Sequence, residues 1–182
     1  FVISITLAVT VIVAKLIGCV LPLLAKKLGF VGLEFLCGDI SKYDAGEKVH
    51  LVISLHACDT ATDLVLAKAM EWNADVILST PCCHHELNHK INCPALAFVT
   101  EHSMLRQKLC DAATDALRLK LLESKGYACD ALELIDPEET PKNIMLRGIR
   151  KKGFDKNSEK AKRAIEEYKK SYTFLTGLEK NV

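Results

Sequence analysis

The chain has 182 residues, which is long enough to enclose the hydrophobic core of one domain. Its formal net charge of +1 excludes a strong overall attraction to nucleic acid or to acidic lipid. Eight cysteines would be many for a disulfide-linked protein of this size, but Cys82 and Cys83 are adjacent and the others are scattered. Because free cysteine behaves as a small buried apolar residue, we expect reduced thiols and a cytoplasmic protein.

Residues 1–25 are almost wholly apolar, and residues 1–13 are rich in β-branched side chains. Lys15 interrupts this stretch, and Lys26 and Lys27 follow it. A transmembrane helix needs about 20 apolar residues, and a lysine near its centre costs about 2.5–3.5 kcal/mol on insertion scales. A signal peptide would carry its positive charge before the apolar run. The pattern therefore favours a buried strand followed by a helix, and no membrane partner.

The centre of the chain predicts a strand–helix–strand unit. Leu33–Cys37, Leu51–Leu55 and Val76–Ser79 are short apolar runs without alternation, which is typical of parallel strands buried on both faces. We expect these three strands to be parallel neighbours. Thr60 and Asp63 match a capping box, which predicts the start of a helix between the second and third strands.

The second half of the chain predicts two long helices and a hairpin. Glu101–Lys125 reads as a helix that ends at Gly126. Its expected apolar stripe comprises Leu105, Leu109, Ala112, Ala116, Leu119 and Leu122. Ala131–Ile135 and Asn143–Ile149 read as an antiparallel edge pair, because the loop between them is too short for a crossover. Asn157–Leu178 reads as a charged, solvated helix.

Reactive side chains follow two strands of the predicted unit. The segment HACDTATD begins after Leu55, and PCCHHEL begins after Thr80. In open α/β sheets, ligands bind beyond the carboxyl ends of the strands. The two loops together therefore predict one functional site.

Three segments resemble a known family: LEFLCGDI from Leu33, LHACDTATD from Leu55 and PCCHHEL from Pro81. They are similar to the methyltransferase-like domain of the class I S-adenosylmethionine-dependent methyltransferases, as is TPKNIMLR from Thr140. The resemblance covers about residues 25–151. It implies an α/β fold with a doubly wound, mostly parallel Rossmann-like sheet and a C-terminal antiparallel hairpin. The implied organisation is a domain over residues 1–152 that is incomplete or divergent at its N-terminus, followed by a charged helical segment over residues 153–182.

The resemblance also implies methyl transfer from S-adenosylmethionine to an acceptor that the sequence does not name; RNA, protein and a small molecule are all candidates. The implied cofactor contacts follow the strands at Leu33–Cys37 and Leu51–Leu55: Gly38, Asp39, Ile40, Leu55, His56 and Ala57. In this interpretation the Asp39 carboxylate accepts the adenine amino group. The alternative is that Asp39 is an ordinary turn aspartate after a glycine.

Four residues are candidates for the chemistry. His56 could serve as a base for the methyl acceptor with Asp59 beside it, or the two could be a structural hydrogen-bonding residue and a helix cap. Cys82 or Cys83 could be a nucleophile of the kind used by RNA cytosine-5 methyltransferases. We favour the simpler interpretation that the two cysteines fill a tight turn. Those enzymes carry a second Pro-Cys after the preceding strand, and this chain does not.

Two features support other functions. His85-Glu86-Leu87-Asn88-His89 matches the H-E-x-x-H pattern of zinc hydrolases, but Pro81 and Pro94 leave only a short helix for it. In addition, the family's glycine-rich loop after the first strand and its acidic residue after the second have no counterpart before Glu34. This gap favours a non-catalytic, methyltransferase-like scaffold as an alternative and predicts weak cofactor binding.

Overall fold

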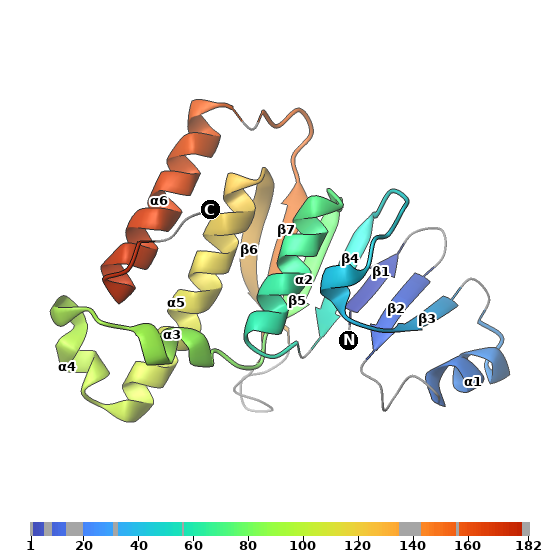
Figure 1. Ribbon diagram of the computed structural model, residues 1–182, viewed down its shortest axis with the longest axis horizontal. Coiled ribbons are helices and arrows are strands. Elements are labelled where there is room, and N and C mark those ends of the chain that lie inside the picture. The colour runs from blue at the N-terminus through green and yellow to red at the C-terminus, as the bar shows by residue number, and fades with distance from the viewer. Residues whose placement is uncertain are drawn as a thin grey trace.

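The computed structural model describes residues 2–5, 9–13, 20–30, 33–55, 57–134, 143–155 and 157–179. The strands are β1 (Val2–Ile5), β2 (Val9–Val13), β3 (Leu33–Cys37), β4 (Leu51–Leu55), β5 (Val76–Thr80), β6 (Tyr127–Glu133) and β7 (Ile144–Arg150). The α-helices are α1 (Val20–Lys27), α2 (Thr60–Glu71), α3 (His85–Lys90), α4 (Ala97–Thr100), α5 (Ser103–Ser124) and α6 (Glu159–Thr176). Figure 1 shows α6 alongside α5 at one end of the molecule and α1 near β3 at the other.

The strands form one seven-stranded sheet in the order β3-β2-β1-β4-β5-β7-β6. As predicted, β4 and β5 are parallel neighbours, with Leu51 opposite Val76 and Leu55 opposite Thr80. The prediction that β3 also adjoins β4 is wrong, because β2 and β1 lie between them. The predicted antiparallel hairpin is confirmed as β6 and β7. β6 is the edge strand, and β7 lies between β5 and β6. Of the six strand pairs in the described chain, only two are parallel, so the fold is α/β with a mixed sheet.

The N-terminal apolar segment differs most from expectation. Instead of one strand, residues 2–13 supply both β1 and β2, which pair antiparallel with Val2 opposite Ile12. β1 also pairs antiparallel with β4, in the middle of the sheet. A β-branched run has the same β-strand propensity whether it forms one strand or two. The strands with which it pairs therefore determine whether it stays one strand or folds into a hairpin. In the described residues, no helix is both long and apolar enough to cross a membrane.

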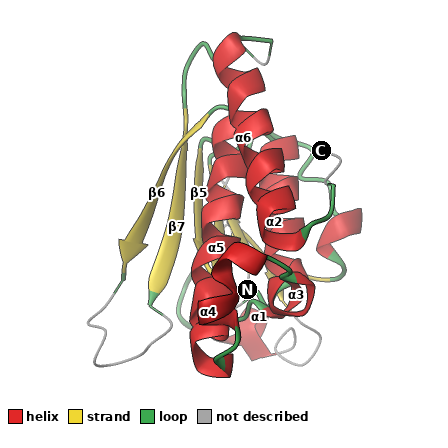
Figure 2. Cartoon of the chain, turned by 90° about the vertical axis from the view of Figure 1, so that its left-hand side faces the viewer, coloured by secondary structure: helices red, strands yellow, loops and turns green. Residues whose placement is uncertain are grey.

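The hydrophobic core lies between the sheet and the helices. Helices α2, α5 and α6 lie on the same side of β5, β7 and β6 (Figure 2). Val52 of β4 and Ile77 of β5 are fully buried against Val65 of α2 and Leu122 of α5. Burial alternates along β4 and β5, so the expectation of strands buried equally on both faces is wrong. The alternation places one face of each strand against α2 and α5 and leaves the other half-buried.

Two local predictions for the helices also need correction. The capping box is absent, because Thr60 is already helical and the Asp63 carboxylate accepts a hydrogen bond from Arg118 instead. The apolar stripe predicted for α5 is wrong as well, since Leu105, Ala112 and Ala116 are exposed. The buried residues of α5 are Cys110, Asp115, Leu117, Arg118, Leu122 and Ser124. Charged side chains therefore occupy the face that packs inward.

Gly126 follows the end of α5, as predicted. Substitution of this glycine tests how Phe154 packs against it. Its φ is +94°, and an added Cβ would lie 2.4 Å from ring carbons of Phe154. Gly126→Ala should lower the free energy of unfolding by about 1–2 kcal/mol for the left-handed backbone and by about 1–3 kcal/mol more for the clash. Gly46→Ala is the matched control, because Gly46 has a φ of +65° and no atom within 4 Å of the added Cβ. Urea unfolding of both variants measures the difference, and equal losses would contradict the packing of Phe154 on Gly126.

Candidate functional site

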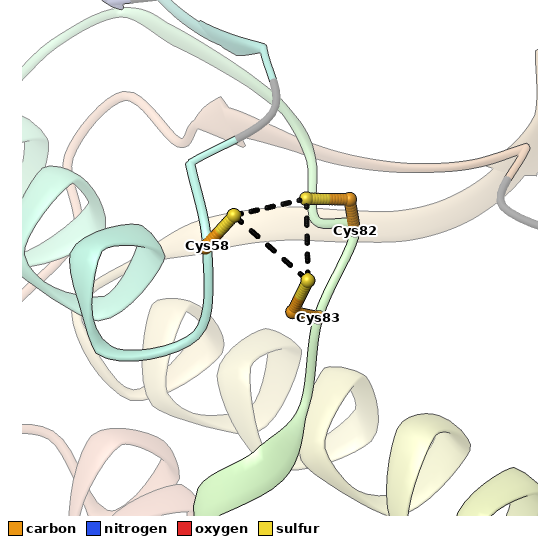
Figure 3. Close-up of side chains that lie close together, drawn as sticks. All are labelled: Cys58, Cys82 and Cys83. Atoms are coloured by element: carbon orange, nitrogen blue, oxygen red, sulfur yellow. Dashed lines mark hydrogen bonds between the residues drawn. The ribbon is translucent and has the colours of Figure 1, made fainter. Parts of the chain in front are cut away.

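The loops that follow β4 and β5 meet at one end of the sheet. The Sγ atom of Cys58, in the first loop, lies 3.5 Å from the Sγ atom of Cys82 in the second. The Cys82 and Cys83 sulfurs are 3.7 Å apart, and those of Cys83 and Cys58 are 3.8 Å apart (Figure 3). All three are cysteine thiols that are not joined in disulfides. The prediction that HACD and PCC lie at the same end of the sheet is therefore confirmed.

Asp59 connects the two loops. Its carboxylate oxygens accept the backbone N–H of Glu86 at 3.2 and 3.4 Å, and Glu86 belongs to the segment after β5. Asp59 occupies the N-cap position of α2 with a φ of +47°, yet its side chain makes no capping bond to that helix. Positive φ is unusual for a residue with a side chain and marks a position that its surroundings must hold. The interpretation of Asp59 as a helix cap is thus replaced by a bridge between loops.

The guanidinium of Arg118 holds the first loop against α5. It donates to the backbone oxygen of Asp59 at 2.9 Å, to the Asp63 carboxylate at 2.7 Å and to the Asp115 carboxylate at 3.2 Å. The same Asp115 oxygen lies 2.8 Å from Nε2 of His84, which directly follows the two cysteines. Arg118 is only 4% exposed, and His84 and Asp115 are buried with it. Both loops are therefore tied to the same short stretch of α5.

The electrostatics of this region follow from burial and pairing. Burial by itself would lower the pKa of Arg118, but hydrogen bonds and charges from Asp63 and Asp115 outweigh it, so the pKa of Arg118 is raised. Burial, and then the neighbouring Cys58 and Cys83 thiols, raise the pKa of Cys82 to about 12. A thiol with this pKa is almost wholly protonated near neutral pH, and the thiolate is the nucleophilic form. With its pKa raised to about 12, Cys82 is consequently a poor nucleophile.

The residues implied as cofactor contacts after β3 form a local turn. Asp39 is exposed, and its Oδ1 atom accepts both the Ser41 N–H at 2.9 Å and the Ser41 hydroxyl at 2.8 Å. These bonds lower the pKa of Asp39, so its carboxylate is charged near neutral pH. Its Oδ2 atom receives neither bond from Ser41. Gly38 is exposed, whereas Ile40 packs against the hydrophobic core.

The implied contacts after β4 lie beside the linked loops. Leu55 is half-buried at the end of the strand, and the backbone oxygen of Ala57 accepts the Thr62 hydroxyl at 2.5 Å. His56, the proposed base, lies outside the described residues. Ala57 directly precedes Cys58 and lies at the opposite end of β4 from Lys48, which forms an ion pair with Asp75. His50 lies at that opposite end as well, with its Nδ1 2.7 Å from the Asp75 carboxylate.

The H-E-x-x-H segment does not assemble a metal site in the described part of the chain. The helix α3 that carries it has six residues, and the Glu86 carboxylate is paired with Lys90. Among described residues, neither His85 nor His89 belongs to a group of three potential metal ligands with all donor atoms within 4.8 Å. The sequence match to a zinc hydrolase thus lacks geometric support.

A separate cavity of about 480 Å³ lies between α2, α3, α5 and α6. Its walls include Leu64, Leu87, Leu117 and Tyr168, with Arg118 at the edge. None of the implied cofactor residues that the structure describes lines it. We therefore place the candidate site at the ends of β4 and β5 and not in this cavity, because the reactive side chains gather there.

Sequence reasoning missed four residues of the site: Cys58, His84, Asp115 and Arg118. The Pro-Cys pattern does not identify Cys58, because alanine and not proline precedes this cysteine after β4. The available signal was that a cysteine follows each of two adjacent parallel strands. Asp115 and Arg118 are three positions apart on α5, a spacing that places both on one helix face.

The fold and the linked loops define a mixed α/β domain with a site at the carboxyl ends of parallel strands. A family model described as a methyltransferase domain matches residues 22–90, which is less than half of the chain. The matched stretch includes β3, α2, both linked loops and α3. A comparison with curated proteins finds no match. The family match supports a methyltransferase relationship and methyl transfer in general.

The buried Arg118 gives a direct test of how the site is held. Arg118→Met should lower the free energy of unfolding by about 3–5 kcal/mol, because it removes the guanidinium charge that is paired with the buried Asp115 carboxylate. Arg163→Met is the control: Arg163 is 81% exposed and pairs with Glu167 on the surface of α6, so its loss should cost about 0–1 kcal/mol. Chemical denaturation measures both variants. Equal effects would show that the Arg118 network does not stabilise the fold.

Proposed function

We propose that the protein is an S-adenosylmethionine-dependent methyltransferase. The observation that carries this proposal is that the matched methyltransferase stretch, residues 22–90, contains both loops that meet beyond β4 and β5. In α/β sheets this edge is where small ligands bind. The acceptor would be an RNA or a protein, and the net charge of +1 favours neither.

The residues present fit one side of the cofactor. The charged Asp39 carboxylate uses Oδ1 for the turn, so Oδ2 can accept the adenine amino group. Gly38 and Ile40 would flank the ring, and Leu55, His56 and Ala57 would border the cofactor at the end of β4. When bound, the cofactor would supply the electrophilic methyl group.

The protein's own contribution would be orientation and proton removal. Methyl transfer is an in-line displacement, so fixed loops can supply much of the rate by aligning the acceptor. Asp59 would position the loop that carries His56, since its carboxylate bonds the Glu86 N–H across the site. His56 would remove the proton of the acceptor. Cys82 and Cys83 would border the acceptor, without a role as nucleophile, because the Cys82 thiol is protonated near neutral pH.

Substitution of the two proposed residues tests this assignment. In protein that transfers methyl groups, His56→Ala should lower turnover by about 10²–10⁴-fold, the usual effect of losing a general base. Asp59→Ala should also lower turnover, with some loss of thermal stability from the broken Glu86 contact. His102→Ala is the control, because His102 precedes α5 and makes no side-chain capping bond. Turnover is measured with radiolabelled S-adenosylmethionine and total RNA or protein; unchanged rates in both variants would remove them from the mechanism.

The second candidate function is a non-catalytic, methyltransferase-like scaffold. It is favoured by the hairpin of β1 and β2, which has only residues 6–8 between its strands. A glycine-rich loop and a helix cannot fit in three residues. The family places such a loop after its first strand, where backbone approaches the cofactor. The connection between β1 and β2 therefore does not supply such a loop for the methionine end of S-adenosylmethionine.

We expect the 182-residue chain to bind S-adenosylmethionine weakly or not at all. Hydrogen bonds to a charged group contribute about 1.5–3 kcal/mol each. In the family, the acidic residue after the second strand binds both ribose hydroxyls through its carboxylate, and this chain has no counterpart before Glu34. Loss of these bonds weakens cofactor binding by roughly a hundredfold or more, at about 1.4 kcal/mol per tenfold. Calorimetric titration measures the dissociation constant. A value in the low micromolar range would contradict the expectation and remove the main support for the scaffold.

A further inference from the structure

The thiols of Cys58, Cys82 and Cys83 form a triangle of a particular size. Its sides are 3.5, 3.7 and 3.8 Å, measured between sulfur atoms (Figure 3). Zinc binds thiolates at about 2.3 Å in tetrahedral geometry, which places any two ligand sulfurs about 3.8 Å apart. We propose that these three cysteines bind a single zinc ion. The proposal does not rest on methyl transfer and would hold equally for a scaffold.

The three sulfurs come from loops that are held before any metal binds. The backbone oxygen of Cys58 accepts the Ala61 N–H at 3.0 Å, which fixes the turn into α2. Asp59, the next residue, bonds the segment after the two other cysteines through Glu86 and accepts a bond from the buried Arg118. Cys82 and Cys83 are followed by His84, which is buried and bonded to Asp115. The site would therefore require little rearrangement of the backbone on metal binding.

The ligand set selects the class of metal. Thiolates are soft ligands that prefer zinc, copper(I) or iron–sulfur clusters over magnesium or calcium. Three sulfur atoms less than 4 Å apart can all contact one ion, whereas a 4Fe–4S cluster is held by cysteines on separate irons and a 2Fe–2S cluster by two cysteines on each iron. Of the single ions, zinc has the tetrahedral geometry that the triangle matches. Binding would convert three thiols to thiolates, release three protons to solvent and give a zinc–thiolate group with a net charge of −1.

Among the described residues, three cysteines supply the ligands, which leaves the fourth position of zinc open. Structural zinc sites are usually closed by four protein ligands, while sites with three hold a water or an external group. Cys82 and Cys83 are half-buried and Cys58 is exposed, so the triangle is accessible from solvent. The fourth ligand would accordingly be water or a group from a bound molecule. The ion would also link the loops after β4 and β5 a second time, beside the Asp59 contact.

Metal titration of the reduced 182-residue chain tests the proposal. Zinc titrated against a chromophoric chelator should bind at one equivalent, with an affinity that falls as the pH is lowered because protons compete for the thiolates. Cobalt(II) in place of zinc should give an intense sulfur-to-cobalt charge-transfer band and the visible bands of a tetrahedral ion. These two readouts need no variant and no activity. A missing charge-transfer band, or no zinc retained, would overturn the proposal.

Variants then locate the ion. Each of the variants Cys58→Ser, Cys82→Ser and Cys83→Ser should lose tight binding of the one zinc equivalent. Cys129→Ser is the matched control, because Cys129 is a half-buried free cysteine on β6 outside the triangle. Asp59→Asn should weaken zinc binding by about 10–100-fold, as expected for a residue that positions metal ligands. Circular dichroism of each variant checks that it is folded.

A double His85→Ala, His89→Ala variant separates this site from the H-E-x-x-H segment. It should keep full zinc stoichiometry and the thiolate charge-transfer band. Loss of zinc in this double variant, with retention in Cys58→Ser, would overturn the cysteine site.

Discussion

The buried guanidinium of Arg118 is the constraint on which the site depends. A charge in the interior is costly unless it is paired and hydrogen-bonded. Arg118 satisfies this requirement with two carboxylates and one backbone oxygen, contributed by α2, by α5 and by the loop before α2. If the start of α2 moved away from α5, that charge would lose two of its three acceptors, the Asp63 carboxylate and the Asp59 backbone oxygen. The loop after β4 is therefore held from the helix layer as well as from the sheet.

The loop after β5 is tied to the same place through Asp115. That carboxylate serves both Arg118 and His84, so one residue of α5 links the two loops. Asp59 adds a direct bond between them through the Glu86 N–H. Side chains from the loop after β4 and the loop after β5 thus lie within hydrogen-bonding distance of each other. The sulfur atoms of Cys58, Cys82 and Cys83 are an example. Such fixed geometry suits a catalytic site or a metal site, because little ordering is left for the ligand to impose.

The sheet has a regular half and an unusual half. From β4 onward the chain forms a parallel pair, with its connecting helix, and an antiparallel hairpin. Before β3, the hairpin of β1 and β2 places an antiparallel strand at the centre of the sheet. The site residues lie at the border, since β4 pairs with β1 on one side and with β5 on the other. A methyltransferase site would need cofactor contacts from both halves, and the hairpin is where the two candidate functions diverge.

The sequence by itself determined the elements whose signals are local. The β4–α2–β5 unit, the hairpin of β6 and β7 and the end of α5 at Gly126 follow from apolar runs, loop length and turn chemistry. The proximity of the two loops also followed, because adjacent parallel strands end at the same edge. Only the tertiary structure decided the rest. The burial of the Arg118 and Asp115 charges depends on partners from α2 and from the loops after β4 and β5. The split of the first apolar segment into two strands depends on pairing with β4, and the meeting of Cys58 with Cys82 and Cys83 depends on the loops being held together. These outcomes rest on contacts between residues far apart in the chain, which local propensity and spacing do not encode.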